Sequence, residues 1–425
     1  MRALAADWVV PVEGDPIADG AVVLDDEGRI HAVGRAAELG ADERFPNAVI
    51  LPGLVNAHSH VEYATYAGFG DGLSFAPWIG MHVERKARLD DEDVLASARL
   101  GVAECLRSGV TTIGDCSFAG ATAPACAALG LRAIVYLEVF GGADAVERLF
   151  EPARERIEGS LSERVRLGIS PHAPYTVTPE LYEAALGLGL PVATHLSESA
   201  DEAAYVHDGT GPWAPLAELL VPPLGGSGIR ALAERGLLGD RLLAVHCVTV
   251  DDEEIALLAA HDVAVAHCPR SNAQLGCGIA PLGKLRAAGV RLAIATDSPA
   301  STPSLDLFEE LRVALWLQRA RDADPSSLTA ADALWLATLG GARALGIESE
   351  VGSLVPGKWA DLTVLSLDGS PFDPVEDPAV AVVLGGSPDR VLATLVAGEA
   401  RYRRNEATWR DLTRAGRRAR SRMLP

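Results

Sequence analysis

Eight short apolar runs, each followed by a stretch rich in Ala, Leu, Arg and Glu, constrain the fold of this chain more than any other feature. Repeated strand–helix units build a parallel sheet with helices packed against it. Eight such units over roughly 250 residues predict a (β/α)8 barrel, a fold of about that size. An open, doubly wound sheet is the alternative, but no G-x-G-x-x-G segment follows a strand here. The runs are VILPGLVNAHSH, TTIGDCS, LRAIVYLEVF, VRLGISPHAP, PVATHLSE, LLAVHCV, VAVAHCPRSN and RLAIATDSPA.

Both ends of the chain differ from this middle part, because short strands and turns replace the strand–helix units. The segment 26–28, Asp-Glu-Gly between two apolar runs, is typical of a β-hairpin turn. Short β runs return near the C-terminus, and the Arg-rich end of the chain predicts a solvated terminal helix. We therefore expect a barrel over residues 53–349 and a small β domain that residues 1–52 and 350–425 build together.

Composition and charge exclude several classes of protein. Hydrophobic residues make up 48% of the chain, and no apolar stretch is long enough to cross a bilayer. Lys+Arg 37 against Asp+Glu 58 gives a net charge of −21, which repels polyanions, so we expect neither nucleic acid nor a membrane as a partner. The six cysteines form no C-x-x-C pair, and the first residues do not resemble a signal peptide. We expect a cytoplasmic protein that forms a homo-oligomer.

Residues that can bind a metal end four of the predicted strands. The segment H-S-H ends the first run, and its His58 and His60 point the same way because side chains two apart share a face of a strand. His195 ends the fifth strand, His246 the sixth and Asp297 the eighth. The carboxyl ends of barrel strands meet at one mouth, where active sites of this fold lie. These five side chains are therefore expected to converge.

The residue types indicate which metal such a site would hold. Three imidazoles and one carboxylate suit Zn²⁺, and Fe²⁺ would also fit. Two-metal sites in related barrels usually need a carboxylated lysine on a middle strand. The sequence has three lysines, Lys86, Lys284 and Lys358, and none lies in a predicted barrel strand. We therefore expect one divalent metal ion, zinc in the first place.

Five segments together resemble the amidohydrolase superfamily and, within it, the mononuclear nucleobase-deaminase and chlorohydrolase branch. They are LPGLVNAHSH, HLSE, VAHCPRSN, ATDSPAS and GSLVPGKWADL. The resemblance covers nearly the whole chain and implies a distorted (β/α)8 TIM-type barrel with a β-sandwich formed from both termini. It also implies His58, His60, His195 and Asp297 as the metal ligands.

The resemblance further implies that Glu198, His246 and Asp297 handle protons around a metal-activated water, whose pKa is about 7. Asp297 would accept the water proton and pass it to a leaving amine, and His246 would orient the hydroxide. Glu198 would protonate a ring nitrogen, a step worth roughly 10²–10⁴ in rate. The implied enzyme is a hydrolase of carbon–nitrogen bonds in cyclic amidines, that is, a deaminase.

Three further residues are implied as substrate contacts. The segment S-P-H-A-P-Y-T is similar to one in S-adenosylhomocysteine/methylthioadenosine and aminodeoxyfutalosine deaminases, which implies that His172 touches the substrate. The loop after the first strand resembles one whose Glu holds ribose hydroxyls, and Glu84 is the corresponding residue; such a carboxylate favours a nucleoside over a bare base. The run H-x-H-x-E resembles the aminodeoxyfutalosine deaminases of menaquinone synthesis and implies that Glu62 reaches the pocket.

The resulting expectation is a metal-dependent deaminase of the adenine ring in a nucleoside, either aminodeoxyfutalosine or adenosine, methylthioadenosine or S-adenosylhomocysteine. Within hydrolases, the alternative is attack on another heteroaromatic ring, such as guanine, cytosine or a triazine. A non-catalytic scaffold is the alternative of another class. For the histidines outside these segments, structural or surface roles are expected; they are His31, His82, His207 and His261.

Overall fold

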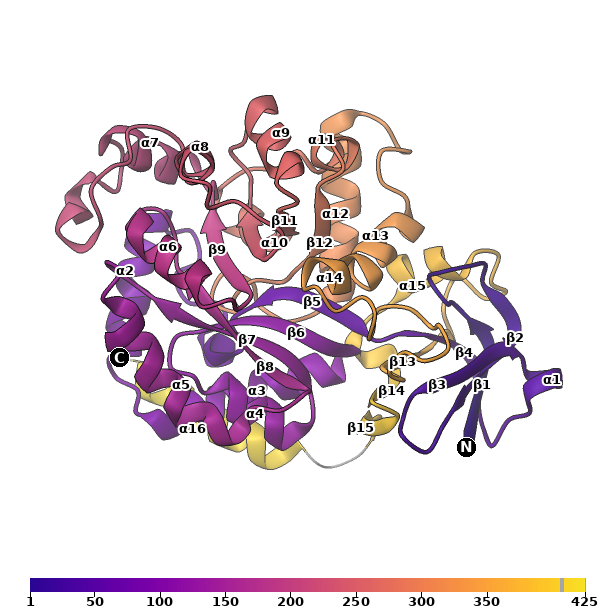
Figure 1. The fold of residues 1–425 in the computed structure, drawn as a ribbon. Coiled ribbons are helices and arrows are strands. Elements are labelled where there is room, and N and C mark those ends of the chain that lie inside the picture. The colour runs from indigo at the N-terminus through magenta and orange to yellow at the C-terminus, as the bar shows by residue number, and fades with distance from the viewer. Residues whose placement is uncertain (406–408, 425) are drawn as a thin grey trace.

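Two sheets organise the computed structural model, which describes residues 1–405 and 409–424 (Figure 1). The larger sheet has eight parallel strands, each beside its neighbour in sequence, in the order β12-β11-β10-β9-β8-β7-β6-β5. Helices follow the strands and surround this sheet, so the predicted distorted (β/α)8 barrel is confirmed. The barrel strands are β5 (Leu54–Ser59), β6 (Val110–Ser117), β7 (Arg132–Val139), β8 (Val165–Pro171), β9 (Val192–Leu196), β10 (Leu242–His246), β11 (Ala264–His267) and β12 (Arg291–Ile294).

The barrel closes at its mouth, where its first and last strands end. Ser59 and Asp297 form an isolated parallel bridge. The Asp297 N–H donates to the His58 carbonyl oxygen at 3.1 Å. The polar residues that end β5 and follow β12 are therefore part of the contact that closes the sheet.

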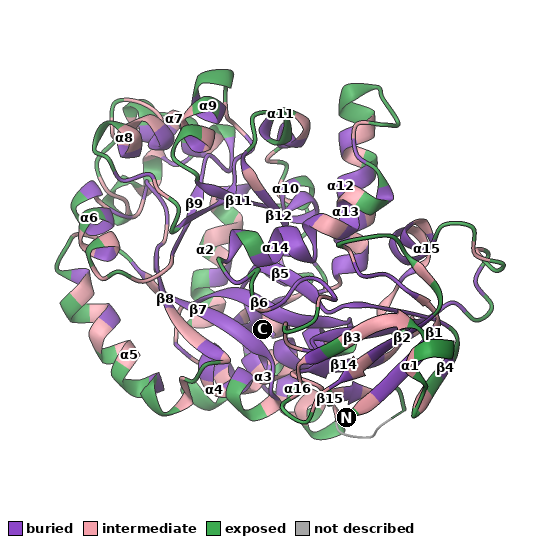
Figure 2. Cartoon of the chain, turned by 45° about the vertical axis from the view of Figure 1, so that its right-hand side comes forward, coloured by how far each residue is buried: buried purple, intermediate pink, exposed green. Residues whose placement is uncertain are grey.

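Side chains inside the barrel alternate along each strand, as they do in any sheet. On β7, Ile134 and Tyr136 point into the apolar interior, and Glu138 is the next inward position. On β9, Ala193 points inward and His195 follows it on the same face. The barrel strands are almost entirely buried (Figure 2). Along these strands, the inward-facing side chains are therefore apolar inside the barrel and polar at its mouth.

Both ends of the chain form the second sheet, in the order β15-β14-β13-β4-β1-β2-β3. β1 and β4 pair in parallel and the other neighbours pair antiparallel. The small β domain expected from both termini is therefore present, and the hairpin predicted at residues 26–28 joins β2 and β3. We propose the domain division at residues 52/53 and 349/350 from this sheet membership. The strands are β1 (Arg2–Val9), β2 (Ile17–Leu24), β3 (Ile30–Arg35), β4 (Glu43–Pro52), β13 (Leu362–Ser366), β14 (Val391–Val396) and β15 (Glu399–Arg403).

The first predicted strand is divided between the two sheets. Its residues Val49–Pro52 belong to β4, and β5 begins after Gly53. A Cβ atom on Gly53 would lie 2.1 Å from Thr111 Oγ1, so only glycine fits where the chain crosses from one sheet to the other. A buried ion pair also joins the two parts, because Arg132 Nε lies 3.0 Å from Asp361 Oδ2.

The sequence led us to expect a solvated terminal helix. The helix α16 (Arg410–Met423) is present, but one side of it is buried. It packs against α3 (Asp91–Arg107) and buries Gly416, Ala419 and Met423. Among the described residues, no helix combines the length and apolar composition needed to cross a membrane. The other helices are α1 (Ala36–Leu39), α2 (Phe75–Lys86), α4 (Thr122–Leu129), α5 (Glu151–Ile157), α6 (Pro179–Gly187), α7 (Ala200–Asp208), α8 (Gly228–Glu234), α9 (Asp252–Ala260), α10 (Pro269–Gln274), α11 (Leu282–Ala287), α12 (Leu307–Asp322), α13 (Ala330–Leu336), α14 (Leu339–Ala344) and α15 (Pro378–Gly385).

Candidate active site

A cavity of about 310 Å³ opens at the mouth of the barrel. Its size lies within the range of pockets that take small organic ligands. Polar side chains from the strand ends line one part of it, namely His60, His195, Glu198, His246 and Asp297. The remaining wall is largely apolar and includes Phe75, Trp78, Ile79, Phe140, Tyr175 and Trp213.

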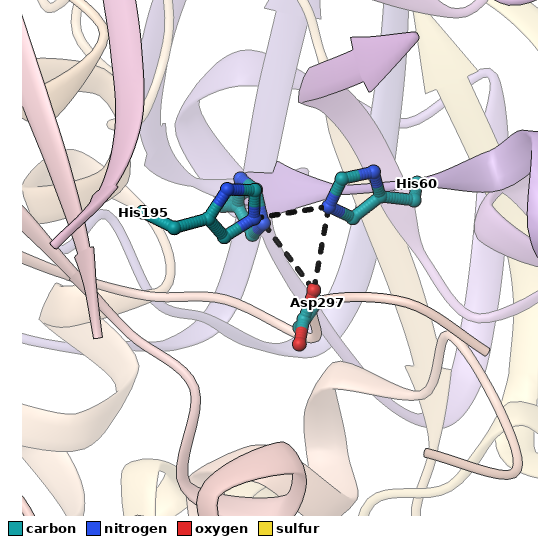
Figure 3. Close-up of side chains that lie close together, drawn as sticks. His60, His195 and Asp297 are labelled. Atoms are coloured by element: carbon teal, nitrogen blue, oxygen red, sulfur yellow. Dashed lines mark hydrogen bonds and ion pairs between the residues drawn. The ribbon is translucent and has the colours of Figure 1, made fainter. Parts of the chain in front are cut away.

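Four of the sequence-predicted residues come together at this cavity, and we call them the ligand cluster: His58, His60, His195 and Asp297. The last three line the cavity, and His58 is buried next to them. Each offers one ligand atom, and these four atoms all lie within 4.8 Å of one another. His60 Nε2 lies 3.3 Å from His195 Nε2 and 3.5 Å from Asp297 Oδ1, and these groups point toward one another in Figure 3. His58 Nε2 lies 3.3 Å from Asp297 Oδ1.

The imidazoles of the ligand cluster have the form that a metal ion needs. His195 Nδ1 donates to the His172 carbonyl oxygen at 2.9 Å, which leaves Nε2 free to bind. His58 Nδ1 lies 3.7 Å from Cys116 Sγ, and His58 Nε2 is buried without a hydrogen-bond partner among the described residues. Burial and the neighbouring His58 lower the pKa of His60 to about 3, so its ring is neutral at pH 7. The cluster therefore fits a divalent metal ion.

Asp297 is held by its backbone and by two hydroxyl groups. Its φ of 61° lies in the left-handed region, which non-glycine residues adopt mainly where surrounding structure demands it. Ser271 Oγ and Ser301 Oγ donate to Oδ2, at 2.5 and 3.0 Å, so Oδ1 is the oxygen that faces the histidines. Burial alone would raise the pKa of Asp297, but the close approach of the His58 ring and the other imidazoles around the carboxylate hold that pKa well below its usual range.

His246 enters the site through an irregular backbone. Val245 points into the barrel interior, so regular alternation would turn the next side chain outward. A φ of 76° at His246 redirects the ring into the cavity. Its Nδ1 donates to Asn272 Oδ1 at 2.9 Å, and burial lowers its pKa to about 4, so Nε2 is an unprotonated acceptor at neutral pH. Nε2 has no hydrogen-bond partner among the described residues.

Glu198 lies next to His246, with Oε1 3.5 Å from Nε2. Burial, with the charges of Asp297 and Glu202, raises the pKa of Glu198 well above its usual value. The Glu202 carboxylate accepts from the backbone N–H groups of Ser197 and Glu198, at 2.9 and 2.6 Å, and so fixes the segment that carries Glu198. Its raised pKa favours the protonated acid form of Glu198 beside the ligand cluster.

His172 lines the cavity directly after β8, where the sequence placed a substrate contact. Its ring lies against that of His195, with centroids 4.9 Å apart. Its Nδ1 lies 2.8 Å from Thr176 Oγ1. Burial and the positive charge of Lys86 lower the pKa of His172 to about 3, so the ring is neutral.

Glu62 does not reach the cavity, contrary to the expectation from the H-x-H-x-E run. It lies in a 3-10 turn (Val61–Tyr66), is buried, and accepts hydrogen bonds from the segment between β6 and α4. The Ser117 hydroxyl and the N–H groups of residues 118, 119, 121 and 122 donate to it. Its carboxylate therefore anchors that segment and has little capacity left for a substrate.

Glu84 is also turned away from the cavity. It lies on α2, its side chain is 70% exposed, and it pairs with Arg88 one helical turn later at 2.6 Å. The neighbouring positions Val83 and Lys86 face the cavity instead. The prediction of a ribose contact at Glu84 is therefore not supported, because the helix presents this position to solvent.

The sequence analysis did not identify several polar residues of the cavity wall, among them Glu138 and His82. Glu138, at the carboxyl end of β7, lines the cavity, and burial raises its pKa to about 7 although the charge of Lys86 opposes this. His82 also lines the cavity, is buried, and has no hydrogen-bond partner on either nitrogen among the described residues; a structural or surface role was expected for it. Glu138 could have been predicted from the sequence, because it continues the inward positions of Ile134 and Tyr136 on the same strand.

Comparisons with known proteins agree with this fold and site. The chain is 34% identical to 5-methylthioadenosine/S-adenosylhomocysteine deaminase from Moorella thermoacetica, over 95% of this chain and 94% of the relative. It is 34% identical to 5'-deoxyadenosine deaminase from Methanothermobacter thermautotrophicus, over 80% and 78%. A crystal structure of an adenosine deaminase from Xanthomonas campestris with bound zinc superposes with a TM-score of 0.86 at 30% identity, covering 99% and 98% of the two chains.

The distorted (β/α)8 barrel with three histidines and one aspartate at its strand ends is the arrangement of a metal-dependent hydrolase. The sequence profile of the amidohydrolase family matches residues 49–401. The chain belongs to the amidohydrolase family, as the sequence motifs led us to expect.

Proposed function

We propose that this protein is a deaminase that replaces the exocyclic amino group of an adenine nucleoside with oxygen from water and releases ammonia. The observation that carries the proposal is the arrangement of Glu198, His246 and Asp297, whose polar atoms lie within 4.8 Å of one another in the cavity. The relatives named methylthioadenosine/S-adenosylhomocysteine deaminase and 5'-deoxyadenosine deaminase support the same class of substrate.

The proposal includes one divalent metal ion, zinc, held by the ligand cluster. Three imidazole nitrogens and a carboxylate oxygen are a donor set that Zn²⁺ accepts readily. The orphaned, buried His58 Nε2 supports this, as does the zinc in the Xanthomonas campestris adenosine deaminase. When bound, such an ion supplies a Lewis acid that makes water nucleophilic at neutral pH.

The protein's own residues would then move the protons. Asp297, which its lowered pKa keeps as a carboxylate, accepts a proton from the attacking water and later passes it to the departing amine. His246 Nε2, an acceptor, orients that water. Glu198, whose raised pKa favours its protonated form, donates to a ring nitrogen, which draws electrons away from the carbon that carries the amino group.

The same proposal covers the partners and location of the enzyme. Its substrate is a small nucleoside, and the net charge of −21 disfavours nucleic acid as a partner. We propose a cytoplasmic homo-oligomer. Light scattering coupled to size-exclusion chromatography would measure the oligomeric state, and a monomer at micromolar concentration would contradict that part.

A panel of nucleosides tests the function directly. Zinc-loaded enzyme is incubated with adenosine, 5'-deoxyadenosine, methylthioadenosine, S-adenosylhomocysteine and aminodeoxyfutalosine, and ammonia is measured. We expect release from at least one nucleoside. Release only from guanine, cytosine or a triazine would instead favour the other heteroaromatic class. Tight metal binding without turnover of any of these compounds would favour the non-catalytic scaffold.

A further inference from the structure

Glu138 and His172 form a polar pair on the cavity wall next to the ligand cluster. Both line the cavity, and Glu138, His172 and His195 each offer a side-chain polar atom within 4.8 Å of the others. Glu138 comes from β7 and His172 directly follows β8, and the register of these two strands sets Glu138 beside Ser170. The barrel therefore brings the pair together at the same height of the mouth.

The hydrogen bonds around His172 determine which of its nitrogens faces a ligand as an acceptor. Thr176 Oγ1 donates its only proton to the Ala173 carbonyl oxygen at 3.1 Å. It must therefore accept from His172 Nδ1, 2.8 Å away, so Nδ1 carries the ring proton. Nε2 is then the ring nitrogen left for a ligand, and it is an acceptor when Nδ1 carries the proton of the ring. Glu138 as a carboxylate also only accepts, so the pair requires a ligand with hydrogen-bond donors.

The positive charge of Lys86 limits which hydrogen-bond donors of a ligand can bind to Glu138 and His172. Lys86 lines the same cavity, and its positive charge acts on both Glu138 and His172. A second cation near the pair, whether an ammonium group or a metal ion, would be repelled by Lys86. His195 Nδ1 already donates to the His172 carbonyl oxygen and offers no lone pair there. A neutral donor therefore suits the pair, and the hydroxyl groups of a ribose are such donors.

We propose that Glu138 and His172 bind the vicinal ribose hydroxyls of the nucleoside, the task that the sequence had led us to expect of Glu84. This inference rests on the deaminase function proposed above. Two hydroxyl protons match two acceptors, and the bond to the carboxylate is charge-assisted and therefore the stronger. Glu138 is thus a specificity residue that favours ribosides over deoxy analogues.

Deoxy analogues and a pair of Glu→Gln variants test this assignment. kcat/KM is measured for adenosine and 2',3'-dideoxyadenosine with the wild type, Glu138→Gln and, as the matched control on the exposed face of α2, Glu84→Gln. We expect the wild type to prefer adenosine by about 10- to 100-fold, the range for hydrogen bonds to a charged group. Glu138→Gln should reduce that preference about tenfold, and Glu84→Gln should leave it as in the wild type.

Product binding gives a readout that does not depend on turnover. Inosine should raise the melting temperature of the wild type more than 2',3'-dideoxyinosine does, and Glu138→Gln should remove this difference. An unchanged adenosine preference in a folded Glu138→Gln variant overturns the inference alone. Failure of the wild type to deaminate any nucleoside overturns the proposed function as well. A second bound zinc that Glu138→Gln removes would show that the pair binds a cation, which also refutes the assignment.

Discussion

The Asp297 N–H donates to the His58 carbonyl oxygen at 3.1 Å, and the side chains of the same two residues approach to 3.3 Å between Oδ1 and Nε2. The first contact closes the barrel between β5 and the end of β12, and the second is part of the ligand cluster. A metal ion bound there would hold together the two ends of the eight-stranded sheet.

Removal of the metal should therefore lower stability as well as activity. A ligand that binds only the folded state, at about 1,000 times its Kd, adds about 4 kcal/mol to the free energy of unfolding. We expect a chelator to abolish this increment and zinc to restore it, as measured by calorimetry. In a His58→Asn variant the chelator should have much less effect. Identical melting curves with and without metal would contradict the link between closure and metal binding.

Replacement of the proposed proton donor should separate chemistry from metal binding. Glu198→Gln keeps the shape of the side chain but cannot supply a proton, so kcat should fall by roughly 10²–10⁴. Elemental analysis should still find the metal content of the wild type, because Glu198 is not in the ligand cluster. A variant with near wild-type kcat would refute the role of Glu198.

Substrate affinity should depend on pH through Glu138. Burial raises its pKa to about 7, so the charged form that accepts hydroxyl protons most strongly is lost as the pH falls through that value. For a pKa of about 7, the charged fraction grows roughly tenfold between pH 6 and pH 8. KM for adenosine should fall over that interval by up to the same factor. The Glu138→Gln variant should lack this change of KM with pH. An identical pH profile of KM in the wild type and the variant would contradict the role of Glu138.

Glu62 and Glu84 should differ in their effect on stability. Glu62→Gln places an amide among backbone N–H donors that need an acceptor, and each unsatisfied buried group costs about 1–3 kcal/mol. We expect urea unfolding to show a loss of about 3 kcal/mol. Glu84→Gln removes an exposed pair and should change the free energy of unfolding by less than about 1 kcal/mol. Equal effects of the two variants would argue against the anchoring role of Glu62.

The buried Arg132–Asp361 ion pair, which joins the barrel to the terminal sheet, should contribute strongly to the free energy of unfolding. Asp361 also accepts from the Ala397 N–H at 2.8 Å. Asp361→Ala leaves the Arg132 charge buried without its partner, which costs about 3–5 kcal/mol. The double variant Arg132→Met, Asp361→Leu should recover much of that loss in urea unfolding. If the double variant were as unstable as Asp361→Ala, lost packing or the lost Ala397 hydrogen bond, and not the unpaired charge, would be the cause.

Much of the fold and of the ligand cluster could be predicted, because both follow from periodicity. Strand ends of a barrel meet at one mouth, so His60, His195 and Asp297 were expected to meet once their strands were recognised. Glu84 could not be placed in this way, because the segment around it forms helix α2, and its orientation depends on tertiary packing.

Backbone irregularities account for the other differences. His246 faces the cavity only because of its left-handed φ, and regular alternation gives no sign of this. β5 also shifts register against β6 between Asn56 and Ser59, so the two-residue period alone does not explain why His58 and His60 converge. Glu138 was within reach of the sequence, since it continues the inward positions of β7.

The pairing of β4 with β13 sets an order in which the molecule can be completed during synthesis. Strands β1 to β4 leave the ribosome first, yet the neighbour that covers the edge of β4 is made only after all eight strands of the barrel. Until then, the nascent chain carries an open sheet edge, and such edges invite pairing with other chains. The topology therefore leaves the N-terminal strands open to such pairing until β13 has been made.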